Sequence, residues 1–408
     1  MSVSRGALPI ALSSLIALVL GCSPPRPALP EPGSFELHDA LEIQLFAAEP
    51  DVVDPVALAF DASERMYVVE MRDYPLGLPP DGRAGGTIRL LEDRDRNGRA
   101  DSSTVFAEGL SFPTSVAPWM GGIFVTAPPQ ILYLEDEDGD GRADLREVVY
   151  DGFTLGVTDS NVNGLRWAID NRIHGANGGN GGRVGDLVLR GLDFAFDPRS
   201  RAFETTYQTA GGFGLVFDQW GRSFAPYNVD HLQQRMVPVR YLERAPALPP
   251  LDATINVSVH GAMARVFPIS APSTRPNHPE QAGYYSAAGG IGYLDFEGEG
   301  IPRGLLVCDV VGNLVSRELV GEDGPAASTE RAPEERAREF FASRDPAFRP
   351  TGVEMGPDGA LYLIDMQRDT IEHPDYIPES RRGADLRAGA DRGRIYRIVP
   401  RRGLPRRR

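Results

Sequence analysis

Short apolar segments that alternate with polar residues and stop at tight turns recur along this chain. Each copy reads as strand, turn, strand, and Asp, Asn and Gly supply the turn, as they do in β-hairpins. The chain holds 45 glycines and 35 prolines, which agrees with a fold that has many turns. The clear copies fall at residues 55–69, 162–174, 214–224 and 351–364, and weaker copies fall at 114–125 and 291–307.

Six copies predict an all-β fold, a six-bladed β-propeller with irregular insertions around a central channel. The turns are roughly 50 to 80 residues apart, and propeller blades repeat every ~40–50 residues. A pair of β-sandwiches is the alternative, but it does not explain the repeated turn. Helical periodicity is scarce, and the one short helix is expected at residues 330–343.

A second repeat concentrates acidic residues in two loops. Residues 87–93 resemble residues 130–136, and both copies continue into a loop crowded with acidic residues, their first aspartates 43 positions apart. The oxygen-bearing residues are Asp93, Asp95, Asn97 and Asp101 in the first loop, and Asp136, Asp138, Asp140, Asp144 and Glu147 in the second. Ca²⁺ prefers six to eight oxygen ligands, and a glycine permits the sharp bend such a loop needs.

These loops therefore predict two structural calcium sites. Ordinary hairpin chemistry is the alternative, because Asn-Gly and Asp-Gly are favoured turns in any case. That alternative explains the glycine and one neighbour, but not the further carboxylates beside them. Glu147 stands where an EF-hand loop has its bidentate Glu. The flanks predict strands, however, so the loops look more like the calcium loops of integrin-type propellers.

The N-terminus has the pattern of a targeting segment. Arg5 precedes an apolar run that ends in Val-Leu-Gly-Cys at residues 19–22, which fits a lipoprotein signal peptide over 1–21 with acylation at Cys22. A Pro-rich linker follows at 22–34, then the propeller at 35–400 and a basic tail at 401–408. We expect a lipid-anchored protein of the bacterial envelope, on the periplasmic face of the outer membrane.

Composition disfavours some classes of partner and cofactor. The formal charge of −15 argues against a nucleic-acid partner. After Cys22 only Cys308 remains, so the mature chain can form no internal disulfide, and it contains no Cys-x-x-Cys-His motif for covalent haem.

From Ile43 to Val399 the chain resembles the putative membrane-bound dehydrogenases, also called PVC-type haem-binding proteins. Their propeller is similar to the soluble quinoprotein glucose/sorbosone dehydrogenases. The matching stretches include residues 54–61 (DPVALAFD), 138–149 (DGDGRADLREVV), 312–317 (GNLVSR), 356–362 (GPDGALY), 371–374 (IEHP) and 391–397 (DRGRIYR).

The resemblance implies oxidation of a sugar or alcohol by pyrroloquinoline quinone, assisted by Ca²⁺, with electrons passing to a separate cytochrome. It also implies a His that removes a proton, but the aligned position here is Ser160. Serine alone has no reason to act as a base, so another residue must take that role. Relatives also tend to have His where Ser316 stands.

Two groups of residues are the candidates for that chemistry. His260 with Arg265 could supply a base and a cation for an anionic quinone or substrate. Asn163 and Arg166, in the matching Asn-Gly-Leu-Arg-Trp stretch, are the candidate cofactor contacts. Two functions stay open: an envelope-anchored quinoprotein-type sugar or alcohol dehydrogenase, and a catalytically inactive propeller that binds a glycan or a protein partner.

Overall fold

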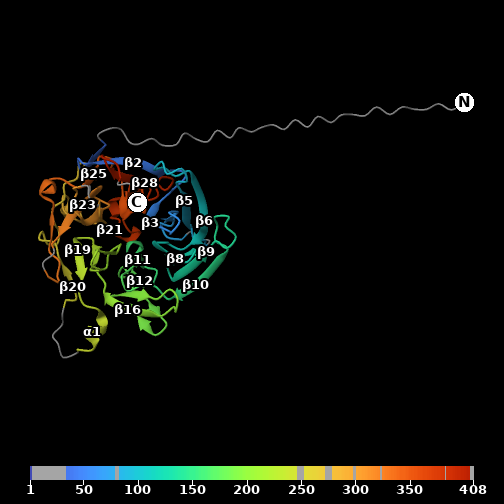
Figure 1. The fold of residues 1–408 in the computed structure, drawn as a ribbon. Helices are drawn as coiled ribbons and strands as arrows, with labels where there is room; N and C mark the ends of the chain where they lie inside the picture. The colour runs from blue at the N-terminus through green and yellow to red at the C-terminus, as the bar shows by residue number, and fades with distance from the viewer. Residues whose placement is uncertain are drawn as a thin grey trace.

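The computed structural model describes Met1 and residues 34–78, 82–245, 252–271, 278–296, 300–321, 324–381 and 383–404. Within this part, six large antiparallel sheets surround a common centre (Figure 1). The predicted six-bladed propeller is therefore confirmed. No described helix is long and apolar enough to cross a membrane.

The first three sheets follow one another along the chain. Blade 1 contains β3 (Pro55–Phe60), β4 (Met66–Glu70), β5 (Gly86–Glu92) and β6 (Ser102–Leu110). Blade 2 contains β7 (Ser115–Trp119), β8 (Gly122–Ala127), β9 (Gln130–Glu135) and β10 (Leu145–Asp151). Blade 3 contains β11 (Asn163–Trp167), β12 (Ile173–Ala176), β15 (Leu192–Phe196) and β16 (Phe203–Gln208), with a small hairpin of β13 (Arg183–Val184) and β14 (Leu187–Val188) inserted.

The other three sheets complete the ring. Blade 4 contains β17 (Val216–Phe217), β18 (Ser223–Tyr227), β19 (Asp230–Arg235) and β20 (Thr254–Asn256). Blade 5 contains β21 (Ala288–Leu294), β22 (Gly304–Asp309), β23 (Leu314–Val320), β24 (Thr329–Arg331), β25 (Phe341–Ser343) and β1 (Phe35–Leu37). Blade 6 contains β26 (Pro350–Met355), β27 (Leu361–Asp365), β28 (Arg394–Pro400) and β2 (Leu41–Ala48).

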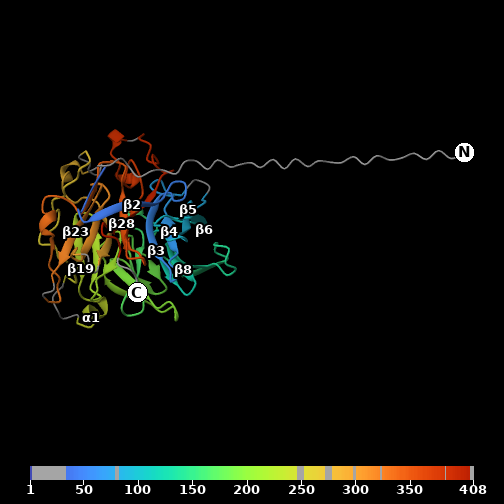
Figure 2. The same ribbon diagram turned by 45° about the horizontal axis from the view of Figure 1, so that its top comes forward.

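The two ends of the chain meet in blade 6. β2 pairs antiparallel with β28 from Leu41↔Pro400 to Ala48↔Arg394, and Figure 2 shows the two strands side by side. The first long strand thus becomes the outer strand of the last blade, and this pairing closes the ring.

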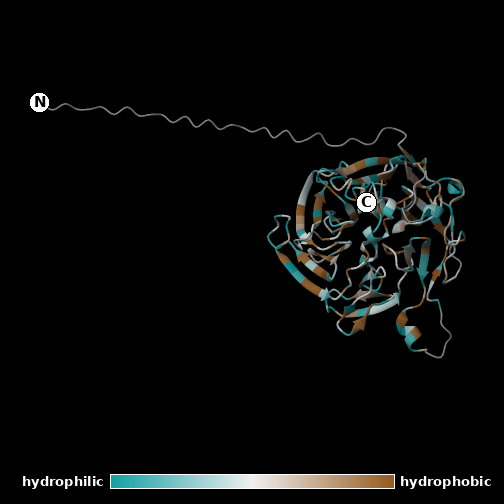
Figure 3. Cartoon of the chain, turned by 180° about the vertical axis from the view of Figure 1, so that it is seen from behind, coloured by the Kyte–Doolittle hydropathy of each residue, from teal (hydrophilic) through white to brown (hydrophobic). Residues whose placement is uncertain are grey.

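Apolar side chains between neighbouring blades form the core. One cluster joins Phe46 and Tyr362 of blade 6 to Leu58 of blade 1, and another places Phe124 of blade 2 against Phe194 and Phe196 of blade 3. Burying each such side chain contributes roughly 1.5–3 kcal/mol. Along the peripheral strands, hydrophobic and hydrophilic residues alternate (Figure 3), as expected when one strand face is solvated.

The predicted helix at residues 330–343 is wrong. That segment contains the end of β24, the 3₁₀ turn η3 (Pro333–Glu335) and β25, because Arg331, Glu335 and Glu339 turn inward into buried ion pairs. The α-helix of the described part is α1 (Val239–Glu243), which precedes β20. Further 3₁₀ turns are η1 (Thr158–Ser160), η2 (Pro279–Gln281), η4 (Pro374–Tyr376) and η5 (Glu379–Arg381).

Candidate functional site

Three cavities follow one another along the channel. An upper cavity of about 380 Å³ lies where the innermost strands β3, β11, β17, β21 and β26 begin, and a lower cavity of about 470 Å³ lies where they end. A narrow space of about 50 Å³ connects them. Close approach of β21 to β26 contributes to the narrowing, since a Cβ on Gly290 would lie 2.2 Å from the carbonyl oxygen of Thr351.

The upper cavity combines an apolar wall with hydrogen-bonding groups. Its residues come from the first positions of innermost strands, from the loops that lead into these strands and from loops between second and third strands. The apolar part includes Val56, Met71, Phe213, Val310, Met366 and Ile371. The polar part includes Tyr74, Thr158, Asp159, Ser160, Asn228, His278 and Glu372. A small molecule with both apolar and hydroxylated surface matches such a lining.

Tyr74 is the most unusual of these residues. Its side chain is almost fully buried, and its hydroxyl has no hydrogen-bond partner among the described residues. Burial, with a smaller contribution from the nearby Asp159 and Glu372 carboxylates, raises the pKa of Tyr74 well above its usual value. The hydroxyl therefore stays protonated, and leaving it unpaired costs about 1–3 kcal/mol.

Two further residues bring proton chemistry to this cavity. Ser160, at the end of η1, lines the cavity, so the position that the family resemblance aligns with a His belongs to this lining. His278 lies on the same wall, and its Nδ1 is 3.1 Å from Oε1 of Glu280. Sequence reasoning missed His278 as a candidate because the residue follows no strand pattern and no motif that would indicate a base.

The predicted pair His260 and Arg265 does not belong to this cavity. Both residues are exposed, and neither lines any of the three channel cavities. The Arg265 guanidinium lies 5.3 Å from the ring centre of Phe267. The structure therefore contradicts the prediction that they form a catalytic pair in the channel. After β20 the segment continues at the upper end, where the N–H of Met263 donates to the carbonyl of Val229, but it leaves His260 and Arg265 in solvent.

The structure also gives other roles to Asn163 and Arg166, the predicted cofactor contacts. Asn163 is fully buried, and its side chain donates to the carbonyls of Asn161 and Gly212 and accepts from the N–H of Gly214. These hydrogen bonds use both the nitrogen and the oxygen of the Asn163 amide, and they fix the start of β11. Arg166 lies toward the lower end, where it is ion-paired with Glu354.

The two acidic loops occupy equivalent positions in blades 1 and 2. Each joins the third strand to the fourth, which places both at the lower end. The structure brings together the carboxylates of Asp93, Asp95 and Asp101 in one loop and of Asp136, Asp138 and Asp144 in the other. The same carboxylates accept backbone N–H bonds, such as that from Gly98 to Asp93 (2.8 Å) and that from Gly141 to Asp136 (2.9 Å).

The remaining predicted calcium ligands lie differently. The Asn97 amide donates to Asp95 of the first group at 2.9 Å and accepts from the N–H of Arg99, whereas Asp140 accepts from the N–H of Arg142 and is not part of the second group. Glu147 lies on β10, and its carboxylate pairs with Arg201 at 3.1 Å. The prediction that Glu147 is a calcium ligand is therefore wrong in this arrangement. Calcium binding by the loops themselves stays a prediction.

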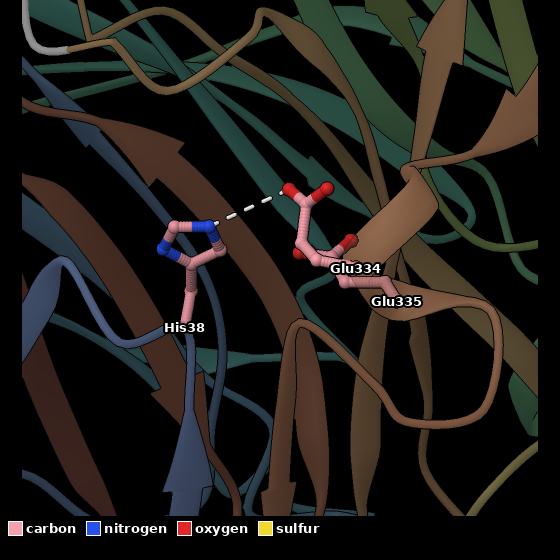
Figure 4. Close-up of side chains that lie close together, drawn as sticks. All are labelled: His38, Glu334 and Glu335. Carbon is pink, nitrogen blue, oxygen red and sulfur yellow. Dashed lines mark ion pairs between the residues drawn. The ribbon is translucent and has the colours of Figure 1, made fainter.

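A third acidic group involves His38, Glu334 and Glu335 (Figure 4). His38 Nε2 is 3.5 Å from Glu334, and both glutamates also bind Arg317 at 2.8 Å. Burial, and then the Arg317 charge, lower the pKa of His38. Because the guanidinium already neutralises the carboxylates, we interpret this group as an ion-pair network.

Of the two cysteines, the structure describes Cys308. Cys308 is fully buried, and burial raises the pKa of its thiol far above the usual range, so it is inert. Cys22 and the predicted signal peptide lie outside the described residues, and lipidation stays a prediction. Ser316, where relatives tend to have His, is buried and hydrogen-bonded to Tyr285.

The family model for the domain of unknown function DUF7133 matches residues 31–402. The chain belongs to this family. No curated protein matches the sequence. Among solved structures, a luciferin-regenerating enzyme is 11% identical with a TM-score of 0.51, covering 90% of this chain and 97% of that chain.

Two sugar dehydrogenases also match this DUF7133 member along most of its length. A putative glucose dehydrogenase from Thermus thermophilus is 15% identical, with a TM-score of 0.49, covering 88% of this chain and all of that chain. A PQQ-bound aldose sugar dehydrogenase from Streptomyces coelicolor is 14% identical, with a TM-score of 0.46, covering 88% and 98%. At these identities the likeness concerns the propeller fold alone.

Proposed function

We propose that this DUF7133 protein binds a small sugar or alcohol in the upper cavity. One observation carries the proposal: the buried Tyr74 hydroxyl has no described partner in the wall of a cavity that holds about 380 Å³. Because the hydroxyl is shielded in the ligand-free chain, a small turn of the ring would bring it to a ligand hydroxyl, which would satisfy a donor that folding alone leaves unsatisfied. The apolar residues Val56, Met71 and Phe213 would contact the carbon skeleton.

Quinone-dependent oxidation of that ligand is the second candidate, and the His278–Glu280 pair favours it. An imidazole held by a carboxylate can accept a hydroxyl proton, which is the role that the family resemblance gives to His at the position of Ser160. Oxidation also requires an acceptor for hydride, which pyrroloquinoline quinone supplies when it is bound.

The described lining of the upper cavity does not fit that cofactor. Pyrroloquinoline quinone carries three carboxylates, yet the described residues of the lining include Asp159 and Glu372 and no arginine. Lysine is absent from the whole sequence. Arg368, which donates to the carbonyl of Tyr74, is already bound to Asp54. We therefore rank binding above oxidation.

Titration calorimetry of the purified chain with a series of aldoses and polyols tests the proposal. Tyr74→Phe should weaken binding about two- to tenfold, since one hydrogen bond is worth about 0.5–1.5 kcal/mol. Tyr362→Phe, which removes a hydroxyl near the start of β27 and outside the upper cavity, is the matched control and should bind normally. Absence of binding for every compound, or equal affinity in Tyr74→Phe, would refute the proposal.

A dye-reduction assay separates the two candidates. The protein is incubated with Ca²⁺ and pyrroloquinoline quinone, and reduction of an artificial acceptor is followed with the sugars that bind. We expect binding without reduction. Reduction that disappears in His278→Ala, while sugar binding persists, would establish the dehydrogenase instead.

A further inference from the structure

The lower ends of the innermost strands share a feature that the upper ends lack. β3, β7, β11, β17 and β26 finish on Phe60, Trp119, Trp167, Phe217 and Met355, and β21 has Tyr293 next to its last residue. A large aromatic or apolar side chain is thus repeated at one level in all six blades. The repeat surrounds the mouth of the channel opposite the upper cavity.

Four of these aromatic residues line the lower cavity: Phe60, Trp167, Phe217 and Tyr293. They come from blades 1, 3, 4 and 5, so the walls face one another around the channel axis. The cavity holds about 470 Å³, within the range of small-molecule sites.

An ion pair separates this cavity from the narrow part of the channel. Arg166 of blade 3 reaches Glu354 of blade 6, the opposite blade of the ring, and both residues line the lower cavity and the narrow space. Arg166 also donates from Nε to the carbonyl of Leu215 at 3.1 Å. About a quarter of each side chain remains accessible. The floor of the cavity therefore offers donors and acceptors side by side.

Trp167 is positioned as a binding surface. Its indole N–H donates to the carbonyl of Pro118 at 3.0 Å, which fixes the ring, while 42% of the residue stays exposed. Ile169 and Trp220, on the adjoining turns of blades 3 and 4, are 77% and 64% exposed. All three tryptophans of the chain, including Trp119, lie at this end.

We propose that the lower cavity is a second ligand site, which binds one sugar unit of a neutral saccharide. The flat, apolar C–H face of a pyranose packs on a fixed indole, while its hydroxyls can exchange hydrogen bonds with both partners of the Arg166–Glu354 pair. The net charge of −15 disfavours an anionic sugar, and so does the floor of the cavity, where Glu354 already neutralises Arg166. The open mouth leaves room for the rest of a glycan chain.

Tryptophan fluorescence and saturation-transfer NMR with cellobiose, maltose and N,N′-diacetylchitobiose test this site. At least one disaccharide should alter the emission and receive transferred saturation. Trp167→Ala should weaken that binding at least tenfold, and Trp167→Phe should weaken it less. Trp220→Ala, which removes a more exposed indole outside the cavity, is the matched control and should bind as the wild type does. Circular dichroism verifies that each variant is folded.

Three results would overturn the assignment. The first is that none of the three disaccharides binds. The second is that folded Trp167→Phe and Trp167→Ala both bind with unchanged affinity. The third is that binding is lost in Tyr74→Phe and kept in Trp167→Ala, because that pattern would move the saccharide to the upper cavity.

Discussion

An arginine–carboxylate pair joins two blades at each end of the channel, but the two pairs lie in different surroundings. At the upper end Arg368 forms two hydrogen bonds to Asp54, of 2.6 and 2.8 Å, and both side chains are fully buried. At the lower end the Arg166–Glu354 pair remains about a quarter accessible. A buried pair cannot exchange partners without exposing a charge to a low-dielectric interior, whereas a partly hydrated pair can.

The comparison suggests different roles for the two ion pairs: the buried upper pair holds the fold together, and the accessible lower pair is free to contact a ligand. The upper end uses its buried charges to fix blades 1 and 6 and leaves a neutral hydroxyl, that of Tyr74, unsatisfied beside the cavity. The lower end leaves its charges accessible under a ring of aromatic side chains. Substituting the same residue type at both ends therefore gives a direct test of the difference.

Arg368→Met should have the largest effect. It removes the partner of the buried Asp54 carboxylate, and breaking a buried pair costs about 3–5 kcal/mol. The loss should appear as a lower midpoint of urea unfolding near pH 7.5. A variant as stable as the wild type would show that Asp54 does not depend on this arginine.

The penalty of Arg368→Met should shrink as the pH falls. Burial raises the pKa of Asp54 to about 7, even though Arg368 lowers it. The folded pKa lies above the unfolded one, so acidification stabilises the folded state. Without Arg368 the folded pKa of Asp54 rises further, so the variant gains more stability than the wild type from the same acidification. The gap in unfolding midpoint between variant and wild type should narrow from pH 8 to pH 5.5. A gap that is constant or widens would contradict a buried carboxylate.

Calcium binding to the lower acidic loops should have the next largest effect. A ligand that binds only the folded state adds about 2.7 kcal/mol at a hundredfold excess over its Kd. Ca²⁺ should raise the melting temperature of the wild type, and combined Asp136→Asn and Asp138→Asn should reduce the rise by removing one site. If chelator and Ca²⁺ give the same melting curve, the hairpin-turn interpretation is correct.

The two tyrosine variants should change stability in opposite ways. Tyr362 donates to Asp358 at 3.2 Å, so Tyr362→Phe should cost about 1 kcal/mol. Tyr74→Phe removes a buried hydroxyl that has no described partner, so the ligand-free protein should be equally or more stable. A clear loss of stability in Tyr74→Phe would mean that the hydroxyl is satisfied in solution, and would weaken the argument for the upper cavity.

The sequence predicted the parts of the molecule that repeat. Strand alternation and turn residues located all six inner hairpins, and the 43-residue repeat located the paired acidic loops. The closure of the ring by β2, the outer strand of blade 6, was not predictable, because residues more than 340 positions apart pair there. The helix prediction failed at Arg331 and Glu339, where charges expected on a solvated face form a buried pair.

The site was less predictable than the fold for a physical reason. Tyr74, Ser160 and His278 stand on loops, whose residues follow no period, so sequence spacing does not show that they meet. Only Ser160 was located, and only through the family resemblance. His260 was chosen for its imidazole and its neighbouring glycine, but local sequence cannot tell whether a loop side chain points into the channel or into solvent.

Arg166→Met should cost far less stability than Arg368→Met and so completes the comparison of the two ends. The Glu354 carboxylate that it leaves behind keeps contact with water, and partly exposed pairs contribute about 0–1 kcal/mol. The unfolding midpoint should therefore shift much less than in Arg368→Met, measured in the same buffer. Saccharide affinity at the lower cavity should nevertheless fall, because half of the polar floor is gone. If Arg166→Met instead destabilised the protein as much as Arg368→Met, the lower ion pair would stabilise the fold by joining opposite blades. The two ends of the channel would then not differ in the role of their ion pairs.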